Sequence, residues 1–398
     1  MSNPNLLTVA LALPGEGATY VKAKIDEGLA TDHAYDVSLF VLHNTIDRDG
    51  VTQTAQGGRT HNQYLAAGST VTILDKHDDG QTLPVYTQAD LEALDAAISG
   101  RGVVTPLEEY PFPALFALNK DRKLPPIVPN LFRSGLNKQE KSPHLVATLL
   151  REIASGAITR ATVDAYASRD TYVSLGVPED VITVVPNGVD LDKFKPSAEA
   201  RARTRAELDI PNDDETPVIL LIARDSGEKD IPLFLKSTTI YLKANPNGHV
   251  MAAGYGLGEN DPHMAELMDT HLGDLTAEQR KRFHAYGQTD SLELLYPAAT
   301  VLALTSATES RPLCITEAFA CGVPVAVSTD VGDARVMIGK HGFIANTREP
   351  QEMADLWAKA TTDKEKLAFP LAQRAELGTR RMVDGYNTVI RAALATAR

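Results

Sequence analysis

The sequence predicts an α/β protein built from two doubly wound parallel sheets. Apolar runs of strand length alternate with helix-length segments along the whole chain, which is typical of βα units. A polar and charged stretch from Asn187 to Pro217, rich in turn-forming residues, separates these runs into two groups, and we expect it to be a solvated linker or loop. The length of 398 residues suits two or three domains. We therefore expect two domains that face each other across a cleft, with ligands bound at the carboxyl ends of the strands.

Each expected element follows from its apolar pattern. In the first half the expected strands are Leu6–Leu13, Val37–Leu42, Val71–Leu74, Gly102–Thr105, Ile127–Leu131, Ala157–Thr159 and Val181–Val185, with helices at Gln88–Ile98 and Pro143–Ala154. In the second half the expected strands are Val218–Ala223, His249–Ala253, Phe283–Tyr286, Val301–Leu304 and Val323–Ser328, with helices at Ile231–Ala244, Ala265–Leu272 and Glu352–Ala360. The final segment, Leu367–Arg398, also has a helical pattern.

These patterns divide the chain into three parts. We expect an N-terminal domain over residues 1–190, a second domain over residues 191–375 and a C-terminal helix over residues 376–398. The apolar run Leu6–Leu13 has no preceding Lys or Arg and ends in Pro-Gly, so it predicts a buried strand and not a signal peptide. No apolar run approaches the roughly 20 residues that span a bilayer. We expect a soluble chain.

Composition narrows the class of protein. The net charge of −13 argues against a protein that coats nucleic acid. Cys314 and Cys321 are the only cysteines, and no CxxC zinc pattern occurs. A reduced pair of core cysteines fits a cytoplasmic location. We expect no metal ion.

Two carboxylates eight residues apart, Glu309 and Glu317, define the most informative motif. Pro312 suits the start of a short helix, and Gly322 suits the left-handed residue past its end. Free N–H groups at a helix N-terminus bind phosphate, and carboxylates accept hydrogen bonds from sugar hydroxyls. The motif therefore predicts a nucleotide-sugar site, although an ordinary αβ connection would also begin with Glu and end at Gly.

A second motif supplies cations. Arg224 and Lys229 follow the expected strand Val218–Ala223. A guanidinium and an ammonium group five residues apart could clamp a diphosphate, although surface cations are common.

Together the two motifs resemble the donor site of retaining GT-B glycosyltransferases, especially the family 4 group. The Glu-x7-Glu block with its Gly-x-Pro turn matches, and Arg224 and Lys229 match a Gly-Arg-x4-Lys-Gly element in which Ala223 and Asp230 replace the glycines. Val185–Asp190 resembles the interdomain segment of the group. The resemblance implies two Rossmann-like domains of the GT-B fold and a hexosyltransferase that moves a sugar from a nucleoside-diphosphate sugar to a sugar-containing or small-molecule acceptor. It implies no further cofactor, and a last helix that packs on the first domain.

The resemblance also implies residue roles. Catalytic roles fall to Glu309, Arg224 and Lys229. Donor contacts are expected at Gly15 and Gly17 in the first loop, at His284 beside the nucleobase, at Glu317 on the ribose, and at Arg311, Leu313 and Cys314.

The first domain departs from the family pattern. Many relatives carry a His after the strand equivalent to Gly102–Thr105, where this chain has Glu108 and Glu109 as candidate contacts for the acceptor or the sugar. The basic segment from Lys120 to Lys141 could receive an anionic acceptor or make a weak contact with a membrane surface. Two alternatives stay open: a nucleotide-sugar-binding relative without transfer activity, and a GT-B synthase or phosphorylase acting on small sugars. The nucleobase, the sugar, the acceptor and the oligomeric state are not specified.

Overall fold

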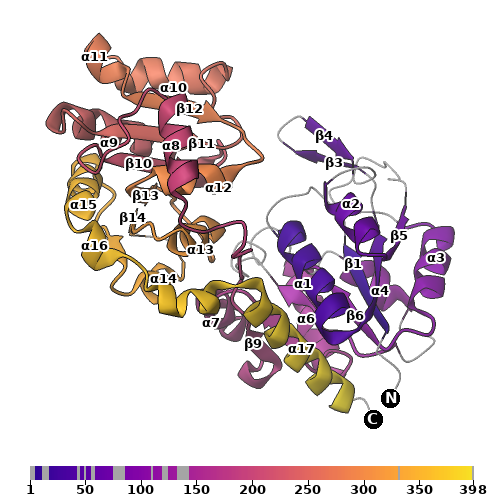
Figure 1. Cartoon of the computed structure of the whole chain (residues 1–398). Coiled ribbons are helices and arrows are strands. Elements are labelled where there is room, and N and C mark those ends of the chain that lie inside the picture. Colours follow the sequence, from indigo (N-terminus) through magenta and orange to yellow (C-terminus); the bar gives the residue numbers. More distant parts are fainter. Residues whose placement is uncertain are drawn as a thin grey trace. The chain divides into compact units, whose positions relative to one another are not determined.

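A computed structural model of the chain describes residues 5–10, 18–42, 45–48, 51–54, 59–74, 86–108, 111–118, 124–131, 143–329 and 332–396. The chain forms two compact units (Figure 1). Unit 1 comprises Met1–Asn187 and Thr379–Arg398, and unit 2 comprises Gly188–Gly378. Within the described ranges, every helix is too short or too polar to cross a membrane.

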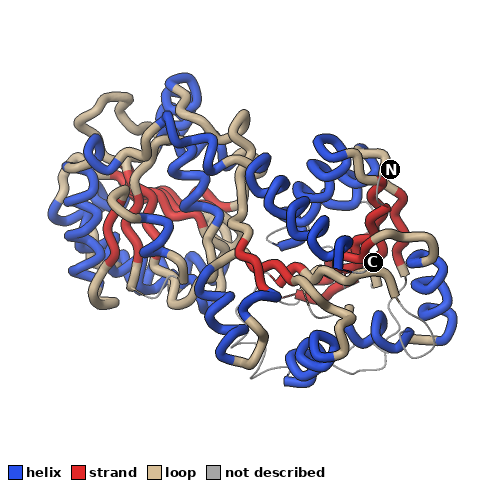
Figure 2. Tube along the Cα trace, turned by 90° about the horizontal axis from the view of Figure 1, so that it is seen from below, coloured by secondary structure: helices blue, strands red, loops and turns tan. Residues whose placement is uncertain are grey.

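Unit 2 contains a six-stranded parallel sheet in the order β12-β11-β10-β13-β14-β15. Its strands are β10 (Val218–Ile222), β11 (His249–Ala253), β12 (Phe283–Gly287), β13 (Val301–Leu304), β14 (Val325–Val327) and β15 (Gly342–Ile344). Numbered along the chain this order is 3-2-1-4-5-6, the order of a Rossmann fold. It reverses between β10 and β13, so the loops after these two strands lie together at the switch point. In Figure 2 the strands form an inner layer with helices on both sides.

The helices of unit 2 lie between these parallel strands along the chain, as expected for an α/β sheet. They are α8 (Ala198–Glu207), α9 (Ile231–Ala244), α10 (Pro262–Leu272), α11 (Ala277–Arg280), α12 (Leu292–Leu295), α13 (Leu313–Ala320), α14 (Ala334–Ile338), α15 (Pro350–Thr362) and α16 (Lys364–Leu367). Short 3₁₀ turns occur at η2 (Gly227–Lys229), η3 (Tyr296–Ala298) and η4 (Leu371–Leu377).

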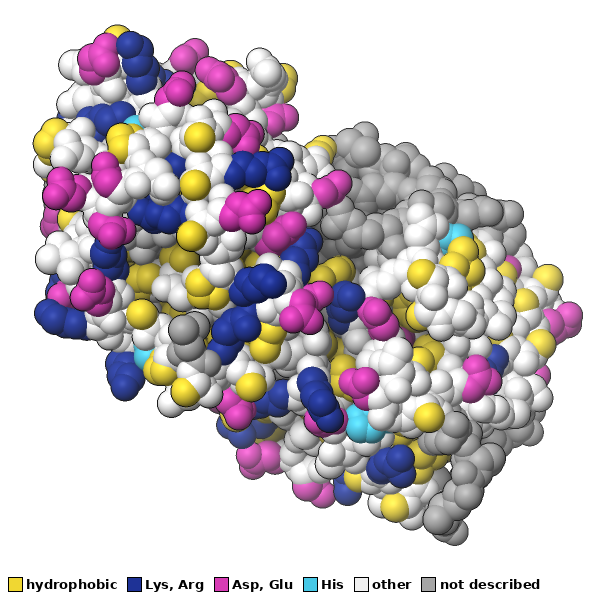
Figure 3. Space-filling model, in the orientation of Figure 1, with side chains coloured by type: hydrophobic (Ala, Val, Ile, Leu, Met, Phe, Trp, Pro, Cys, Tyr) yellow, Lys and Arg dark blue, Asp and Glu magenta, His cyan; other side chains and the backbone are white. Residues whose placement is uncertain are grey.

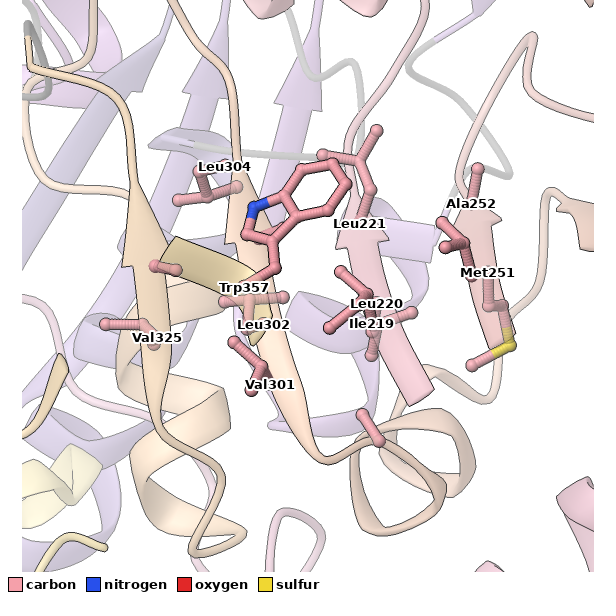
Figure 4. Close-up of a cluster of buried hydrophobic side chains, with 14 of the residues drawn as sticks. Ile219, Leu220, Leu221, Met251, Ala252, Val301, Leu302, Leu304, Val325 and Trp357 are labelled. Atoms are coloured by element: carbon pink, nitrogen blue, oxygen red, sulfur yellow. The ribbon is translucent and has the colours of Figure 1, made fainter. Parts of the chain in front are cut away.

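The core of unit 2 explains why its central strands read as unbroken apolar runs. Strands of a parallel sheet are covered on both faces, and every residue of β13 is buried. Trp357 of α15 is fully buried and projects among the side chains of β10 and β13 (Figure 4). Its ring centroid lies 5.4 Å from that of Phe234 and 6.0 Å from that of Tyr241. α15 thus closes one face of the sheet with an aromatic cluster.

The stretch Asn187–Pro217 is not a solvated linker throughout, contrary to the sequence prediction. Its central part forms α8, where the Ser197 hydroxyl caps the N-terminus by accepting a hydrogen bond from the Ala200 N–H. Arg205 of this helix is fully buried and donates to the carbonyls of Ala298 and Pro211 at 3.1 and 2.7 Å. The prediction failed because charged residues usually indicate a solvent-exposed segment, whereas Arg205 is buried and donates to carbonyls in the interior.

Unit 1 is built on parallel strands in the order β5-β2-β1-β6, followed by β7-β8-β9. The strands are β1 (Asn5–Ala10), β2 (Asp36–Val41), β5 (Thr70–Ile73), β6 (Val103–Pro106), β7 (Asn130–Leu131), β8 (Ala161–Val163) and β9 (Ile182–Val184), with β3 (Thr45–Arg48) and β4 (Val51–Thr54) as a separate antiparallel pair. Parallel bridges from Val104 to Ile127 and from Leu107 to Asn130 connect the two groups of strands. The predicted strand at Ala157–Thr159 is wrong. Only Ile158 makes a bridge there, to Ile127.

The last helix, α17 (Thr379–Thr396), packs on α1 (Ala18–His33) inside unit 1. A Cβ atom on Gly28 would lie 2.4 Å from Cγ2 of Val383, so a glycine is needed where these helices cross. The crossing also carries polar contacts, from His33 Nε2 to Asp384 Oδ1 at 2.9 Å and from the Tyr35 hydroxyl to Asn387 Oδ1 at 3.0 Å. The other helices of unit 1 are α2 (Arg59–Ala66), α3 (Gln88–Ile98), α4 (Phe112–Leu118), α6 (Pro143–Ala154) and α7 (Tyr166–Ser174).

Charged side chains of both signs are interspersed over the described surface that Figure 3 shows.

Candidate active site

The central contact of the candidate site joins Lys229 and Glu309. Lys229 ends the 3₁₀ turn η2 after β10, and Glu309 lies in the loop after β13. Because β10 and β13 are paired in parallel, their carboxyl ends bring these loops together, and the Lys229 ammonium forms an ion pair with Glu309 Oε1. The Ser306 hydroxyl donates to the same oxygen at 2.8 Å. The side chains are mostly buried, with 20% of Lys229 and 13% of Glu309 exposed.

Main-chain contacts fix the two loops against each other. The Ala307 N–H donates to the carbonyl of Glu228 at 2.7 Å. The Thr305 hydroxyl donates to the carbonyl of Lys229 at 3.1 Å. The ion pair therefore rests on a backbone frame.

Arg224 lies in the same loop as Lys229 and one third of its side chain is exposed. Its guanidinium donates to Glu228 Oε1 at 2.6 Å. Burial alone would raise the pKa of Glu228, but hydrogen bonds from its own N–H, from Arg224 and from Ser226 outweigh burial and lower that pKa. In this structure each predicted cation of the loop is thus held by a carboxylate.

The glycine turn after β11 supports this loop from the neighbouring strand. Gly254 has φ +137°, and a Cβ atom there would lie 1.6 Å from the carbonyl oxygen of Ala223. The Asp225 N–H donates to the carbonyl of Tyr255 at 2.8 Å, and the Asp225 carboxylate contacts His263 Nδ1 at 2.5 Å. The close approach of the two backbones explains why glycine stands at position 254.

Helix α13 presents its N-terminus beside Glu309. Pro312 is its N-cap residue, and the helix begins at Leu313. The N–H groups of Leu313 and Cys314 belong to the first turn, where a helix offers no internal acceptor. At the other end Gly322 adopts φ +77°, and the N–H of Val323 donates to the carbonyl of Ala318 at 2.8 Å. These caps agree with the predicted start and end of the helix.

Glu317 lies one turn into α13 and is desolvated. The Tyr296 hydroxyl donates to Glu317 Oε2 at 2.5 Å. Burial raises the pKa of Glu317 to about 7, against the lowering effects of the Tyr296 hydrogen bond and of Lys193. Burial, together with the negative charge of Glu309, also raises the pKa of the Cys314 thiol well above its usual range. The thiol is therefore neutral, and Glu317 titrates near neutral pH.

Arg311 pairs with a carboxylate of unit 2, and its contact with the donor stays a prediction. Its guanidinium forms an ion pair with the buried Asp333 carboxylate at 3.3 Å, and the Asp333 N–H donates to the carbonyl of Ser310 at 2.9 Å. Gly332 lies directly against this turn, since a Cβ atom there would come within 2.3 Å of the Glu309 carbonyl oxygen. In this structure Arg311 braces the Glu309 turn.

His284 is not brought to this cluster. Its ring stacks on that of His249 with centroids 5.3 Å apart, and the His249 Nδ1 and His284 Nε2 atoms lie 3.0 Å apart. His249 opens β11, so the pair lies toward the amino ends of the strands, whereas the Lys229 and Glu309 loops follow the carboxyl ends. Burial lowers the pKa of both rings to about 4. A neutral, mutually paired imidazole at this edge contradicts the expected position beside the other donor-site residues.

Of the candidate site residues in unit 1, only Glu108 lies within the described part of the chain. Glu108 is buried with a left-handed backbone, φ +60°, and its N–H donates to the carbonyl of Asn130 at 2.8 Å. Gly15, Gly17 and Glu109 lie outside the described residues, as do all the basic residues of the segment from Lys120 to Lys141. Among the described residues, no group of three or more acidic, His or Cys side chains could hold a metal ion.

Sequence reasoning missed several residues that shape the site. Ser306 orients Glu309, Tyr296 holds Glu317, and Arg348 donates to main-chain carbonyls of the β13 loop. Ser306 lies two residues after the end of a predicted strand, which was a usable signal. Tyr296 and Arg348 carried none, because their contacts span 21 and 43 positions of the chain.

Comparison with known proteins identifies the kind of domain that carries this geometry. Residues 203–376 match the family model "Glycosyl transferases group 1". The D-inositol 3-phosphate glycosyltransferase of Saccharomonospora viridis is 30% identical over 60% of this chain and 57% of its own length. The enzyme of that name from Corynebacterium jeikeium is 32% identical over 46% of this chain and 44% of its own. The chain thus spans about half the length of these curated relatives.

Solved structures establish the fold of the whole chain. Anabaena HepE, crystallised with UDP-glucose, superposes with a TM-score of 0.73 at 18% identity and covers 99% of this chain and 100% of its own. A glycosyltransferase of Rickettsia africae gives a TM-score of 0.75 at 13% identity over 99% of both chains. The predicted GT-B fold and the predicted resemblance to group 1 glycosyltransferases are both confirmed, and unit 2 carries a glycosyl transferases group 1 domain.

Proposed function

We propose that this chain is a retaining hexosyltransferase that moves a sugar from a nucleoside-diphosphate sugar to a hydroxyl acceptor. The observation that carries the proposal is the meeting of Lys229 with Glu309 at the switch point of the unit 2 sheet. Open α/β sheets bind ligands outside the carboxyl ends of the strands at such a point. Arg224 lies in the same loop as Lys229, and the first turn of α13 follows the loop that holds Glu309.

The roles follow from where charge develops. As the bond between the anomeric carbon and the diphosphate oxygen breaks, negative charge grows on the diphosphate, and Arg224, Lys229 and the first N–H groups of α13 stabilise it. The acceptor oxygen forms the new bond to the anomeric carbon, and its proton passes to the departing diphosphate. Glu309 lies on the sugar side and supports the positive charge of the sugar ring. Glu317 accepts hydrogen bonds from the ribose.

The reaction so described needs no cofactor beyond the nucleotide sugar. For the acceptor we propose a polyhydroxylated small molecule, and inositol phosphate is the first to test because curated relatives of about 30% identity bear the name D-inositol 3-phosphate glycosyltransferase. For the donor, UDP-glucose is the first to test, because the Anabaena protein of the same fold was crystallised with it. The two free thiols agree with our proposal of a reducing, cytoplasmic location.

The proposal is tested first by binding. UDP, GDP, ADP, dTDP and NAD are each added at saturating concentration, and the melting temperature is followed for the wild type and for Arg224→Ala. A ligand at 100 times its dissociation constant adds about 2.7 kcal/mol of stability. We expect one nucleoside diphosphate to raise the melting temperature of the wild type, and the shift to shrink in the variant. A protein that none of the five stabilises would refute a donor site.

Transfer is tested separately. We expect release of nucleoside diphosphate from the matching sugar nucleotide, with the anomeric configuration kept in the product by NMR. Glu309→Gln should abolish release while the protein still binds the nucleoside diphosphate, because the carboxylate acts on the sugar side. Glu278→Gln, a change at an 82% exposed glutamate of α11, is the matched control. Binding without release in the wild type would favour the nucleotide-sugar-binding alternative.

A further inference from the structure

Arg348 connects the three loops that follow β10, β13 and β15. Its Nη1 donates to the carbonyl of Ser306 at 2.9 Å, and its Nη2 donates to the carbonyl of Thr305 at 2.8 Å. Nη2 also donates to Asp230 Oδ2 at 2.6 Å. A planar guanidinium can satisfy acceptors in several directions at once, which an ammonium group at the end of a flexible chain does less well.

Asp230 is shaped to receive this contact. It follows Lys229 directly and has a left-handed backbone, φ +48° and ψ +59°. Its Oδ1 accepts from the Leu233 N–H at 3.1 Å and so caps α9, while its Oδ2 is left for Arg348. Glycine would be the unstrained residue at such a backbone, and the family resemblance places glycine here. An aspartate at this position therefore has a less favourable backbone conformation than glycine would have. Its side chain, however, caps α9 and forms an ion pair with Arg348.

These contacts close a ring around the candidate site. From Arg348 the ring runs through Asp230 to its neighbour Lys229, across the ion pair to Glu309, and through the Ser306 hydroxyl and carbonyl back to Arg348. The Ser306 carbonyl also accepts from the Ser328 hydroxyl at 2.5 Å. Lys229 and Glu309 are thus aligned by a closed network of side-chain and main-chain groups.

We propose that Arg348 is a positioning residue of the site: by holding Asp230 and the Ser306 carbonyl together, it sets the place of the Lys229 ammonium relative to Glu309. The inference rests on the proposed function, because it assumes that Lys229 binds the diphosphate. Arg348 itself touches neither reacting group. Its contribution must therefore disappear when Lys229 is absent.

A double-mutant cycle on diphosphate affinity tests this dependence. The dissociation constant of the nucleoside diphosphate that stabilises the wild type is measured by calorimetry for the wild type, Arg348→Ala, Lys229→Ala and the double variant. We expect Arg348→Ala to weaken binding about tenfold in the wild-type background and less than about twofold in the Lys229→Ala background, since contacting residues in one network are not additive. Equal losses in the two backgrounds would overturn the inference.

A second variant covers the case in which Arg348→Ala fails to fold. Asp230→Asn keeps a residue that tolerates the left-handed region and retains an oxygen to cap α9, but it removes the carboxylate that Arg348 binds. It should reproduce the loss of affinity and the same dependence on Lys229. Full affinity in a folded Asp230→Asn protein would also overturn the inference.

Arg374 supplies the control for a merely structural loss. It is another half-buried arginine of unit 2, and it donates to three main-chain carbonyls, those of Ala320, Leu191 and Phe194. None of these belongs to the β10 or β13 loops. Arg374→Ala should lower the melting temperature with less than about twofold change in affinity, because its contacts lie outside the loops that hold Lys229 and Glu309. A loss as large as that of Arg348→Ala would show a general effect of softening unit 2 and overturn the positioning role.

The outcomes separate this inference from the function beneath it. If Lys229→Ala weakens diphosphate binding and Arg348→Ala leaves it unchanged, the inference alone fails. If the wild type binds none of the diphosphates, the proposed function fails, and the inference falls with it.

Discussion

Replacing Glu317 by glutamine should remove a pH-dependent loss of stability from unit 2. Burial raises the pKa of this carboxyl to about 7, from an ordinary value of 4.5. The groups that face it are the Tyr296 hydroxyl, Lys193, Glu293 and the two thiols. Burial raises the pKa of both thiols, that of Cys321 to about 12. Within this cluster the thiols therefore stay neutral between pH 4.5 and pH 8.

The sign follows from proton linkage. Since the folded pKa lies above the unfolded one, the folded state binds more protons between pH 4.5 and 7, and stability falls as the pH rises. The favourable contribution is complete below pH 4.5 and is lost as the pH rises through 7. One pKa unit corresponds to about 1.4 kcal/mol, so the full loss has an upper limit of about 3 kcal/mol. Glutamine keeps an oxygen that accepts from Tyr296 and carries no charge at any of these values.

Trp357 makes the measurement specific to unit 2. It is the only tryptophan of the chain, and it is fully buried in the core of this unit. Urea unfolding followed by tryptophan fluorescence at pH 5 and pH 8 gives the free energy of unfolding for the wild type and for Glu317→Gln. We expect the variant to gain roughly 2 to 3 kcal/mol relative to the wild type between the two pH values. Glu278→Gln, at an exposed position, should show no such gain.

The difference between the two proteins isolates this group, because other titrating residues contribute equally to both. A stability difference that is the same at pH 5 and pH 8 would refute the reasoning. It would mean that Glu317 is ionised in the folded state across this range, and that the Tyr296 hydrogen bond and Lys193 outweigh burial.

Three further predictions concern the loops and the imidazole pair. Arg224→Ala should weaken nucleoside-diphosphate binding by about tenfold or more, because hydrogen bonds to charged groups contribute about 1.5–3 kcal/mol; calorimetry checks this, and an unchanged affinity would reject the clamp. Gly254→Ala should lower the stability of unit 2 by about 1–3 kcal/mol, since its Cβ atom would lie 1.6 Å from a main-chain oxygen; a melting temperature equal to that of the wild type would contradict this close approach. His284→Gln should reduce the loss of unfolding free energy at acid pH. Both rings have pKa values lowered to about 4, so their contribution to stability is complete above pH 6.5 and is lost as the pH falls through 4. Urea unfolding at pH 7 and pH 4.5 measures it, and an unchanged slope would contradict the paired, neutral rings.

Much of unit 2 follows from local sequence. The strands β11 and β13 and the helix α9 begin and end at the predicted residues, because an apolar run buried on both faces and a periodic helix are local patterns. The caps of α13 are likewise set by Pro312 and Gly322. The motif spacing singled out the loops after β10 and β13 as candidates for the site.

Errors arose where tertiary partners override the local pattern. α8 reads as a charged linker, yet Arg205 satisfies interior carbonyls. His284 was placed beside the nucleobase by the family resemblance, whereas its ring turns to His249 at the amino end of the neighbouring strand. Arg311 is a different case: the resemblance gave it to the donor, the structure pairs it with the buried Asp333, and its donor contact stays a prediction.

The sequence by itself determined the fold class, the two candidate cations and the two candidate carboxylates, and the caps that shape α13, because these depend on residues close in the chain. Only the tertiary structure decided that Lys229 and Glu309 form an ion pair, that Tyr296 holds Glu317 and that Arg348 closes the ring through Asp230. The Lys229–Glu309 contact spans 80 positions and the Arg348–Asp230 contact spans 118. Such contacts are set by the order in which parallel strands lie side by side, and no local pattern encodes which loops that order brings together.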